Sequence, residues 1–366
     1  MAKPDMIERA LMSDRRSAAV IGLGERLAQT PIVTPINYER DGKQDGFLRL
    51  FNSTEKNGYG YVPIPVVCIR NGPGPTAILV GGNHGNEYEG IVGLMHLARQ
   101  LEASQVRGRI IILPALNYPA VMSATRSSPL DGANLNRCFP GTALGGPTAI
   151  IAHYVSSVLL PLADVVVDLH AGGRSGHFVP CAIVQEGRTP DEVADLADLA
   201  EAFGAPMSFV SKGKGRGGSL TLAGECLRQG VACLTAELGG GETLSREGLD
   251  LAIEGVKRVL AQLDILSPQD TVPASGTRWV TKDLDSRVHA HAAGIFEPRV
   301  GLGDVVHADQ VAGLIHFPDM PMAPPDEIRA PCQGRVLSLH IPALVARGDE
   351  LFTLVNDVDP RDDACL

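Results

Sequence analysis

Residues 76–87 of this chain have the sequence TAILVGGNHGNE, in which a short apolar run passes into a glycine-rich turn carrying His84 and Glu87. Two further segments repeat the arrangement: ADVVVDLHAGG at residues 163–173 and VACLTAELGGG at residues 231–241. Short β-branched runs that end in glycines are typical of buried strands in a parallel sheet. Functional residues of open α/β sheets gather at the carboxyl ends of the strands. We call the carboxyl end of each of these three predicted strands, with the glycine-rich turn that follows it, a tip, and we expect the three tips to converge.

The residues at two of these tips are suited to a zinc site. A zinc hydrolase usually has three protein ligands and an open fourth position for water. His84 and Glu87, three residues apart on a strand-to-helix turn, can face one ion, and His170 would supply a third donor from a neighbouring strand. Asp168 is expected to orient a ligand from behind. A surface coincidence would explain His84 and Glu87 alone, and a structural role would explain His170, but the matching tips favour the zinc site.

Glu237, at the third tip, is the predicted general base. It lies between apolar residues and glycines. Such a setting raises the pKa of a carboxyl group towards the working pH of an enzyme. The alternative is a structural glutamate held in a salt bridge.

A long polar segment, ATRSSPLDGANLNRCFPG at residues 124–141, lies between the first two tips. It has no periodicity, and loops of this kind often carry function. Arg137 offers a planar fork for a carboxylate, with the Asn136 donors beside it. Arg126 is expected to meet the oxyanion that forms when a carbonyl is attacked. Without the neighbouring metal motif, both arginines would be taken as solvated surface residues.

The order of apolar patterns predicts an α/β domain over residues 61–270, in which helices cover a sheet. Residues 1–60 are expected to form a polar lead-in that packs on this domain, with a turn at residues 41–46. Residues 271–366 lack helical periodicity and predict a smaller all-β domain. Inside the α/β domain, the pattern predicts a strand at 109–113 and helices at 91–98, 150–155, 191–203 and 246–263.

The predicted β domain contains an internal duplication. Residues 294–306 and 334–351 each predict a strand, a turn that ends in Gly-Asp, and a second strand. This duplication resembles the barrel-sandwich hybrid fold of biotinyl and lipoyl domains. Those carriers attach their group to a lysine, and no lysine follows Lys282 in this sequence. We therefore expect a structural or access-shaping domain.

Composition limits the partners and the compartment. With 44% hydrophobic and 20% charged residues, the 366-residue chain has an ordinary globular composition. A net charge of −10 disfavours nucleic acid and anionic membranes as partners. Seven scattered cysteines, an odd number, favour reduced thiols in a cytoplasmic protein. No apolar run is long enough to span a bilayer, and the oligomeric state stays open, a homo-oligomer included.

Four motifs together resemble the succinylglutamate desuccinylase and aspartoacylase family, a branch related to the zinc carboxypeptidases: NHGNE (83–87), NLNR (134–137), DLH (168–170) and AEL (236–238). The match covers residues 60–265 by motif order, and the trailing β domain also fits the family. NHGNEYEG (83–90) and SPLDG (128–132) are similar to one subgroup, the N-acetyl-diaminobutyrate deacetylases of ectoine breakdown.

The resemblance implies a zinc-carboxypeptidase-like mixed sheet flanked by helices, followed by a smaller β domain. It also implies a role for each matching residue. Zinc would be bound by His84, Glu87 and His170. Glu237 would activate water and Arg126 would polarise the scissile carbonyl, while Asn136 and Arg137 would bind a substrate carboxylate. The family often has aspartate where this chain has Asn134, so no role is carried over to that position.

The resulting hypothesis is a zinc-dependent amidohydrolase that removes a small acyl group from an N-acyl amino acid, a small-molecule substrate. Two alternatives stay open. A metallocarboxypeptidase acting on small peptides would use Asn136 and Arg137 equally well for a C-terminal carboxylate. A non-catalytic binding protein would use the pocket and the β domain for a partner, although all three metal donors and Glu237 are present.

Overall fold

The computed structural model describes residues 22–186, 189–211, 218–281 and 286–358. The α-helices are α2 (Leu23–Ala28), α3 (Tyr88–Gln100), α4 (Tyr118–Met122), α5 (Pro147–Tyr154), α6 (Pro190–Phe203), α7 (Leu222–Gln229) and α8 (Arg246–Gln262). The first strands are β1 (Ile32–Val33), β2 (Gly42–Phe51), β3 (Tyr61–Asn71), β4 (Thr76–Gly81), β5 (Gly108–Leu113), β6 (Val165–His170), β7 (Gly176–Phe178), β8 (Cys181–Gln185), β9 (Met207–Ser211) and β10 (Ala232–Glu237). The later strands are β11 (Arg278–Thr281), β12 (Arg287–His289), β13 (Gly294–Pro298), β14 (Val305–Val306), β15 (Val311–His316), β16 (Asp326–Arg329), β17 (Gly334–His340), β18 (Leu344–Val345) and β19 (Glu350–Asp357).

A long mixed sheet organises the chain. Its strand order is β1-β2-β3-β5-β4-β6-β10-β8-β9-β11-β19-β17-β14, with β12 paired to β19 and β7 to β17. At its centre, β5, β4, β6 and β10 are neighbouring parallel strands, while β8 pairs antiparallel with β10. Every residue of β4 and β6 is buried, as expected for apolar strands covered on both faces. The predicted mixed α/β fold is therefore confirmed.

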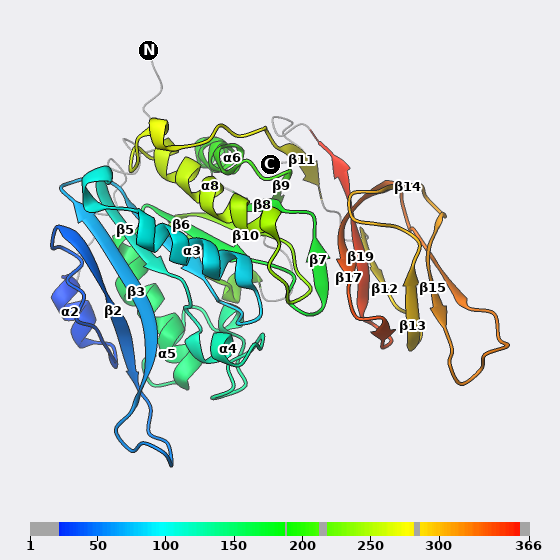
Figure 1. Ribbon diagram of the computed structural model, residues 1–366, viewed down its shortest axis with the longest axis horizontal. Coiled ribbons are helices and arrows are strands. Elements are labelled where there is room, and N and C mark those ends of the chain that lie inside the picture. Colours follow the sequence, from blue (N-terminus) through cyan, green and yellow to red (C-terminus); the bar gives the residue numbers. More distant parts are fainter. Residues whose placement is uncertain (1–21, 187–188, 212–217, 282–285, 359–366) are drawn as a thin grey trace.

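Helices cover both faces of the sheet, and each face has its own apolar core. On one face, α3 packs over β4 and β6, α6 packs over β8 and β10, and α8 contacts both of these helices (Figure 1). Leu94 and Val256 are among the fully buried residues of this face. On the other face, α5, a π-helical turn at Val155–Leu159 and α7 pack against the same strands. The predicted helices within 61–270 and the strand at 109–113 are all confirmed. Among helices of the described residues, none combines the length and apolar character needed to cross a bilayer.

The turn predicted at residues 41–46 is wrong, because those residues begin the ten-residue strand β2. β2 pairs antiparallel with β3 from Gly42↔Arg70 to Phe51↔Tyr61. Buried Gln44 is satisfied by Asn37, whose backbone N–H and carbonyl both bond to the Gln44 side chain. Pairing with the long strand β3 therefore outweighs the turn-forming glycines and aspartates, which mislead a local prediction.

The described residues beyond 286 are all-β, as predicted. β16, β15, β13 and β18 form a second, antiparallel sheet, and β12, β14, β17 and β19 extend the long sheet. An apolar core that includes Val306, Ile315 and Phe352 lies between them. β7, which follows the tip of β6, pairs with β17 and ties this β region to the α/β part (Figure 1). The domain boundaries at residues 60 and 270 stay predictions.

Two helical glycines give a matched test of how closely α3 packs behind the tip of β6. A Cβ at Gly90 in α3 would lie 2.5 Å from the Leu169 Cβ, whereas a Cβ at Gly24 in α2 would meet nothing within 4 Å. We expect Gly90→Ala to lower the free energy of unfolding by about 1–3 kcal/mol through overpacking. Gly24→Ala should raise it by about 0.4–1 kcal/mol. Urea unfolding measures both, and a Gly90→Ala protein as stable as Gly24→Ala would contradict this packing.

Candidate active site

The three glycine-rich tips meet at one edge of the sheet, as predicted. β4, β6 and β10 are adjacent and parallel, with Gly81 opposite Leu169 and Glu237 opposite His170. The Leu238 N–H donates to the His170 carbonyl at 2.9 Å and continues the pairing beyond β10. The register of these three adjacent strands therefore places the ends of β4, β6 and β10 beside one another.

His84, Glu87 and His170 form a buried cluster. Their ligand atoms all lie within 4.8 Å of one another. Glu87 Oε1 is 2.8 Å from His84 Nδ1, and Glu87 Oε2 is 2.8 Å from His170 Nδ1. Each of the three residues is at most 4% exposed. Two imidazole nitrogens and a carboxylate thus converge on one point, and this donor set fits a divalent transition-metal ion.

The remaining nitrogen of each imidazole is also engaged. His170 Nε2 lies 3.0 Å from Asp168 Oδ2, so the predicted contact of Asp168 with His170 is confirmed. His84 Nε2 lies 3.2 Å from Asn134 Oδ1, a contact that the sequence did not predict. Metal-binding histidines almost always use the second nitrogen in this way, which fixes the ring orientation and tautomer. Asn134 is therefore a positioning residue of the cluster.

Electrostatics within the cluster differ between the two histidines. Burial lowers the pKa of His84, and one carboxylate does not offset it. Burial also disfavours charge on His170, but Asp168 and Glu87 flank it and raise its pKa well above the usual value. Burial would likewise raise the pKa of Glu87, yet His170 and His84 lower it to about 2. The shifts of Glu87 and His170 have a shared cause, because the carboxylate lies within hydrogen-bond distance of the imidazole and each charge favours the other.

Arg126 lies directly beside this cluster. Its Nη1 is 3.4 Å from Glu87 Oε1 and 3.4 Å from His84 Nδ1, and its side chain is half exposed. The backbone next to Arg126 is anchored to the turn that carries His84 and Glu87, because the Gly85 N–H donates to the Thr125 carbonyl at 2.9 Å. The guanidinium group thus faces both the donors and the solvent side of the site.

Asn136 and Arg137 also lie at the site. Asn136 Nδ2 is 3.3 Å from His170 Nε2, while Asn136 Oδ1 accepts from the Leu222 N–H at 2.9 Å. Arg137 Nη1 donates to the Asn136 carbonyl at 2.6 Å. Burial lowers the pKa of Arg137, and the like charge of Arg126 lowers it further, so the two guanidinium groups repel each other. Together they make a positive region above the donors that suits an anionic group.

Glu237 lies at the rim, beside His170 in register. Its side chain is partly exposed. The glycines after it permit a close approach, since a Cβ at Gly240 would lie 2.0 Å from the Gly176 carbonyl oxygen. The Gly172 N–H donates to the Gly239 carbonyl at 3.0 Å, which joins the loops that follow β6 and β10. The structure therefore brings all seven predicted site residues to one edge of the sheet, while their roles stay predictions.

Sequence patterns missed a second link between these loops. Glu242 Oε1 accepts from Asn86 Nδ2 at 3.0 Å, and both carboxylate oxygens accept from Arg174 Nε at 3.1 Å. These hydrogen bonds from Asn86 and Arg174 lower the pKa of Glu242. The loops after β4, β6 and β10 are thereby joined through one carboxylate. Only the positive φ of Glu242, 54°, distinguishes it locally, and a sequence does not reveal φ.

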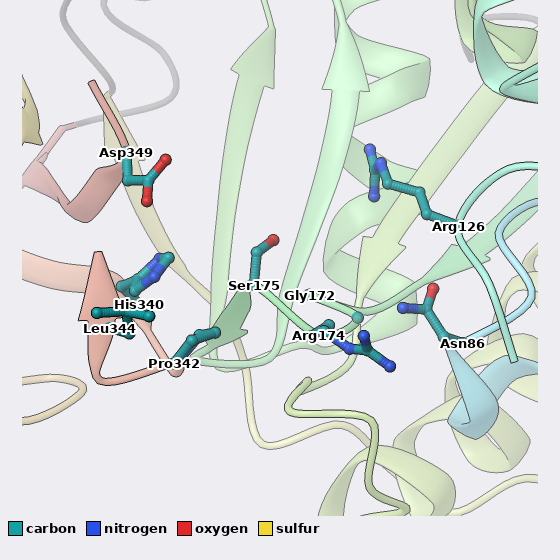
Figure 2. Close-up of a pocket in the computed structure, with 10 residues that line it drawn as sticks. Asn86, Arg126, Gly172, Arg174, Ser175, His340, Pro342, Leu344 and Asp349 are labelled. Atoms are coloured by element: carbon teal, nitrogen blue, oxygen red, sulfur yellow. The ribbon is translucent and has the colours of Figure 1, made fainter. Parts of the chain in front are cut away.

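A cavity of about 340 Å³ opens next to Arg126 (Figure 2). One side is made by Asn86, Arg126 and the loop 172–175, which follows β6. The other side is made by His340, Pro342, Leu344 and Asp349 of the C-terminal β region. This volume is in the range of small-ligand sites.

Comparison with known proteins agrees with this arrangement. The family described as "Succinylglutamate desuccinylase/Aspartoacylase catalytic domain" matches residues 73–263. An N-alpha-acetyl-L-2,4-diaminobutyric acid deacetylase of Halomonas elongata is 37% identical over 331 residues, which cover 90% of this chain and 96% of the relative. A succinylglutamate desuccinylase/aspartoacylase crystal structure from Rhodobacter sphaeroides has a TM-score of 0.85 at 37% identity and covers 90% of this chain and all of its own. A product-bound structure of the ectoine utilization protein EutE (DoeB) from Ruegeria pomeroyi also has a TM-score of 0.85 at 37% identity, with coverages of 89% and 98%.

The contact between Asn134 and His84 can be tested through metal affinity. Asn134→Ala removes the oxygen that orients the His84 ring, so we expect the affinity for a divalent metal to fall about 10- to 100-fold. Asn134→Asp keeps an acceptor oxygen and should retain the affinity. Competition with a chromophoric chelator measures both, and equal affinities for Asn134→Ala and the unmodified protein would rule out the positioning role.

Proposed function

This chain belongs to the succinylglutamate desuccinylase/aspartoacylase family, and we propose that it is a zinc-dependent deacylase that removes a small acyl group from an N-acyl amino acid. The observation that carries the proposal is the buried cluster of His84, Glu87 and His170, with donor atoms within 4.8 Å and Glu237 in register beside it. A non-catalytic binding protein would not require this combination of donors and a neighbouring acid.

The donor chemistry supports zinc as the metal. Two imidazoles and one carboxylate are a common ligand set of catalytic zinc, whereas magnesium and calcium prefer oxygen ligands. His84, Glu87 and His170 would hold the ion. When bound, zinc would polarise a carbonyl group and lower the pKa of a water molecule in its open position. Asp168 and Asn134 would keep the two imidazoles in orientation through their second nitrogens.

Protein side chains would handle charge and protons during hydrolysis. The Arg126 guanidinium group would donate a hydrogen bond to the acyl carbonyl oxygen, which gains negative charge as water adds to the carbonyl carbon. The Glu237 carboxylate would accept a proton from the attacking water. It would then give that proton to the amine nitrogen as the C–N bond breaks, so that the products are a carboxylate and an amine.

Substrate selection would depend first on the positive region next to the donors. Arg137 and Asn136 would bind the α-carboxylate of an N-acyl amino acid, with Arg126 close to Arg137. Identity of 37% to a deacetylase of N-alpha-acetyl-L-2,4-diaminobutyric acid supports N-acetyl-diaminobutyrate as the particular substrate. A carboxypeptidase would use the same carboxylate contact. The two activities differ in the group on the carbonyl side of the amide bond, which is a small acyl group for a deacylase and an amino acid residue for a carboxypeptidase.

A substrate panel tests the activity. We expect the metal-loaded protein to hydrolyse N-acetyl-2,4-diaminobutyrate faster than dipeptides with a free N-terminus by about 100-fold or more in kcat/KM, because the two differ at the reacting acyl group. Mass spectrometry of the products identifies the bond that is cut. Preferential cleavage of dipeptides would favour the carboxypeptidase alternative, and no turnover of any amide would favour a binding protein.

Replacement of Glu237 tests the proton transfer. Glu237→Gln keeps the size of the side chain but removes the base, so kcat should fall roughly 100- to 10,000-fold. Metal content, measured by elemental analysis of the same samples, should not change because Glu237 is not one of the three donors. Unchanged turnover would remove Glu237 from the reaction, and loss of metal would assign it to the metal site instead.

A further inference from the structure

The cavity beside Arg126 is built from two parts of the chain whose relative position is fixed by hydrogen bonds. β7 and β17 pair with Gly176 opposite His340, and the Ile341 N–H donates to the Ser175 carbonyl at 3.2 Å. The C-terminal wall therefore stands at a set position relative to the loop after β6. Arg126 lines the cavity and its Nη1 lies 3.4 Å from Glu87 Oε1, so the cavity adjoins the donor cluster at this side chain.

Most charges at the cavity already have a partner. Arg174 is paired with Glu242, and Arg126 lies against Glu87. Asp349 differs, because its carboxylate accepts one hydrogen bond, from the Ala346 N–H at 2.8 Å, and among the described residues no lysine or arginine pairs with it. Asp349 is half-buried, so only part of this residue is exposed to solvent. A cation entering the cavity would find this carboxylate available.

The two walls also differ in the kind of hydrogen bond they offer. Figure 2 shows Asp349 and His340 on one side, Arg126 and Asn86 on the other, and Ser175 between them. The Asp349 carboxylate is negatively charged and accepts hydrogen bonds, as does the Ser175 hydroxyl, whereas the positively charged Arg126 guanidinium group on the opposite wall only donates. An ammonium group has three donors and no acceptor, so it matches the wall with Asp349. Leu344 and Pro342 add apolar surface for methylene groups.

Building on the deacylase function proposed above, we propose that Asp349 binds a side-chain ammonium group of the substrate. It would thereby select N-acyl diamino acids over N-acyl amino acids with neutral or acidic side chains. Asp349 would act as a specificity residue supplied by the C-terminal β region, separate from the groups at the reacting bond.

A simpler role for Asp349 is to hold its turn, and the duplicated β unit supplies the control. Asp304 occupies the matching Gly-Asp turn and accepts from the Gly301 N–H at 2.7 Å, as Asp349 accepts from the Ala346 N–H at 2.8 Å. Asp304 is exposed and does not line the cavity. Both Asp349→Asn and Asp304→Asn keep an acceptor oxygen for the turn and remove one negative charge. Only the first removes that charge from the cavity.

The experiment compares two substrates of the same shape with the full-length, metal-loaded protein. N-acetyl-2,4-diaminobutyrate carries the ammonium group, and N-acetylnorvaline carries a methyl group in its place. For Asp349→Asn, we expect kcat/KM with the cationic substrate to fall about 10- to 100-fold, mainly through KM, because a hydrogen bond to a charged group is lost. N-acetylnorvaline should be hydrolysed as by the unmodified protein, and Asp304→Asn should match the unmodified protein with both substrates. An equal loss with both substrates, or no loss with either, would overturn the proposal.

A binding measurement separates this proposal from the proposed function. Calorimetric titration with free 2,4-diaminobutyrate and with norvaline requires no turnover. Tighter binding of the diamino acid that disappears in Asp349→Asn would support the specificity role even if no N-acyl substrate were cleaved. Equal binding of the two ligands by the unmodified protein would refute the specificity role, whether or not the deacylase activity is present.

Discussion

The contact on which the rest of the site depends is the double hydrogen bond of Glu87 to two histidines from different strand ends. Its two oxygens lie 2.8 Å from His84 and 2.8 Å from His170, and the residue is 3% exposed. A buried carboxylate stays charged only when it is paired and hydrogen-bonded. The Ala171 N–H adds a bond at 3.2 Å, and Glu87 occupies the N-cap position of α3, where the helix dipole favours negative charge. A slip between β4 and β6 would break this arrangement, so the sheet register and the donor cluster support each other.

Close backbone contacts explain the glycines that surround the donors. A Cβ at Gly85 would lie 2.0 Å from the Ala120 carbonyl carbon, and a Cβ at Gly240 would lie 2.0 Å from the Gly176 carbonyl oxygen. Neither position has space for a side chain, because the backbone of α4 lies directly against Gly85 and the backbone of β7 lies directly against Gly240. The first contact holds the loop that carries Arg126 near His84, and the second joins the loops after β6 and β10. Glycine is thus required at both positions because the backbone of another element lies against them.

Sequence patterns predicted what depends on local periodicity and on strand ends. The apolar runs before His84, His170 and Glu237 indicated adjacent parallel strands, and Asp168, two residues before His170, indicated its hydrogen bond. Contacts between distant loops were not predicted. The bond of Asn134 to His84 and the pairing of Arg174 with Glu242 depend on how separate turns are placed. Strand β2 was missed for a related reason, since its pairing with β3 outweighs a turn-like composition.

The duplicated β unit places its two Gly-Asp turns in different surroundings. Both copies of the unit end a strand in a turn closed by an aspartate, at Asp304 and Asp349. Pairing of β7 with β17 brings the second copy against the loop after β6, while the first copy faces solvent. The same hydrogen bond, from a turn N–H to a carboxylate, therefore has different surroundings in the two copies. Under the role that we propose for Asp349, only the carboxylate of the second copy lies where a ligand in the cavity can contact it, and one short strand pair sets this difference.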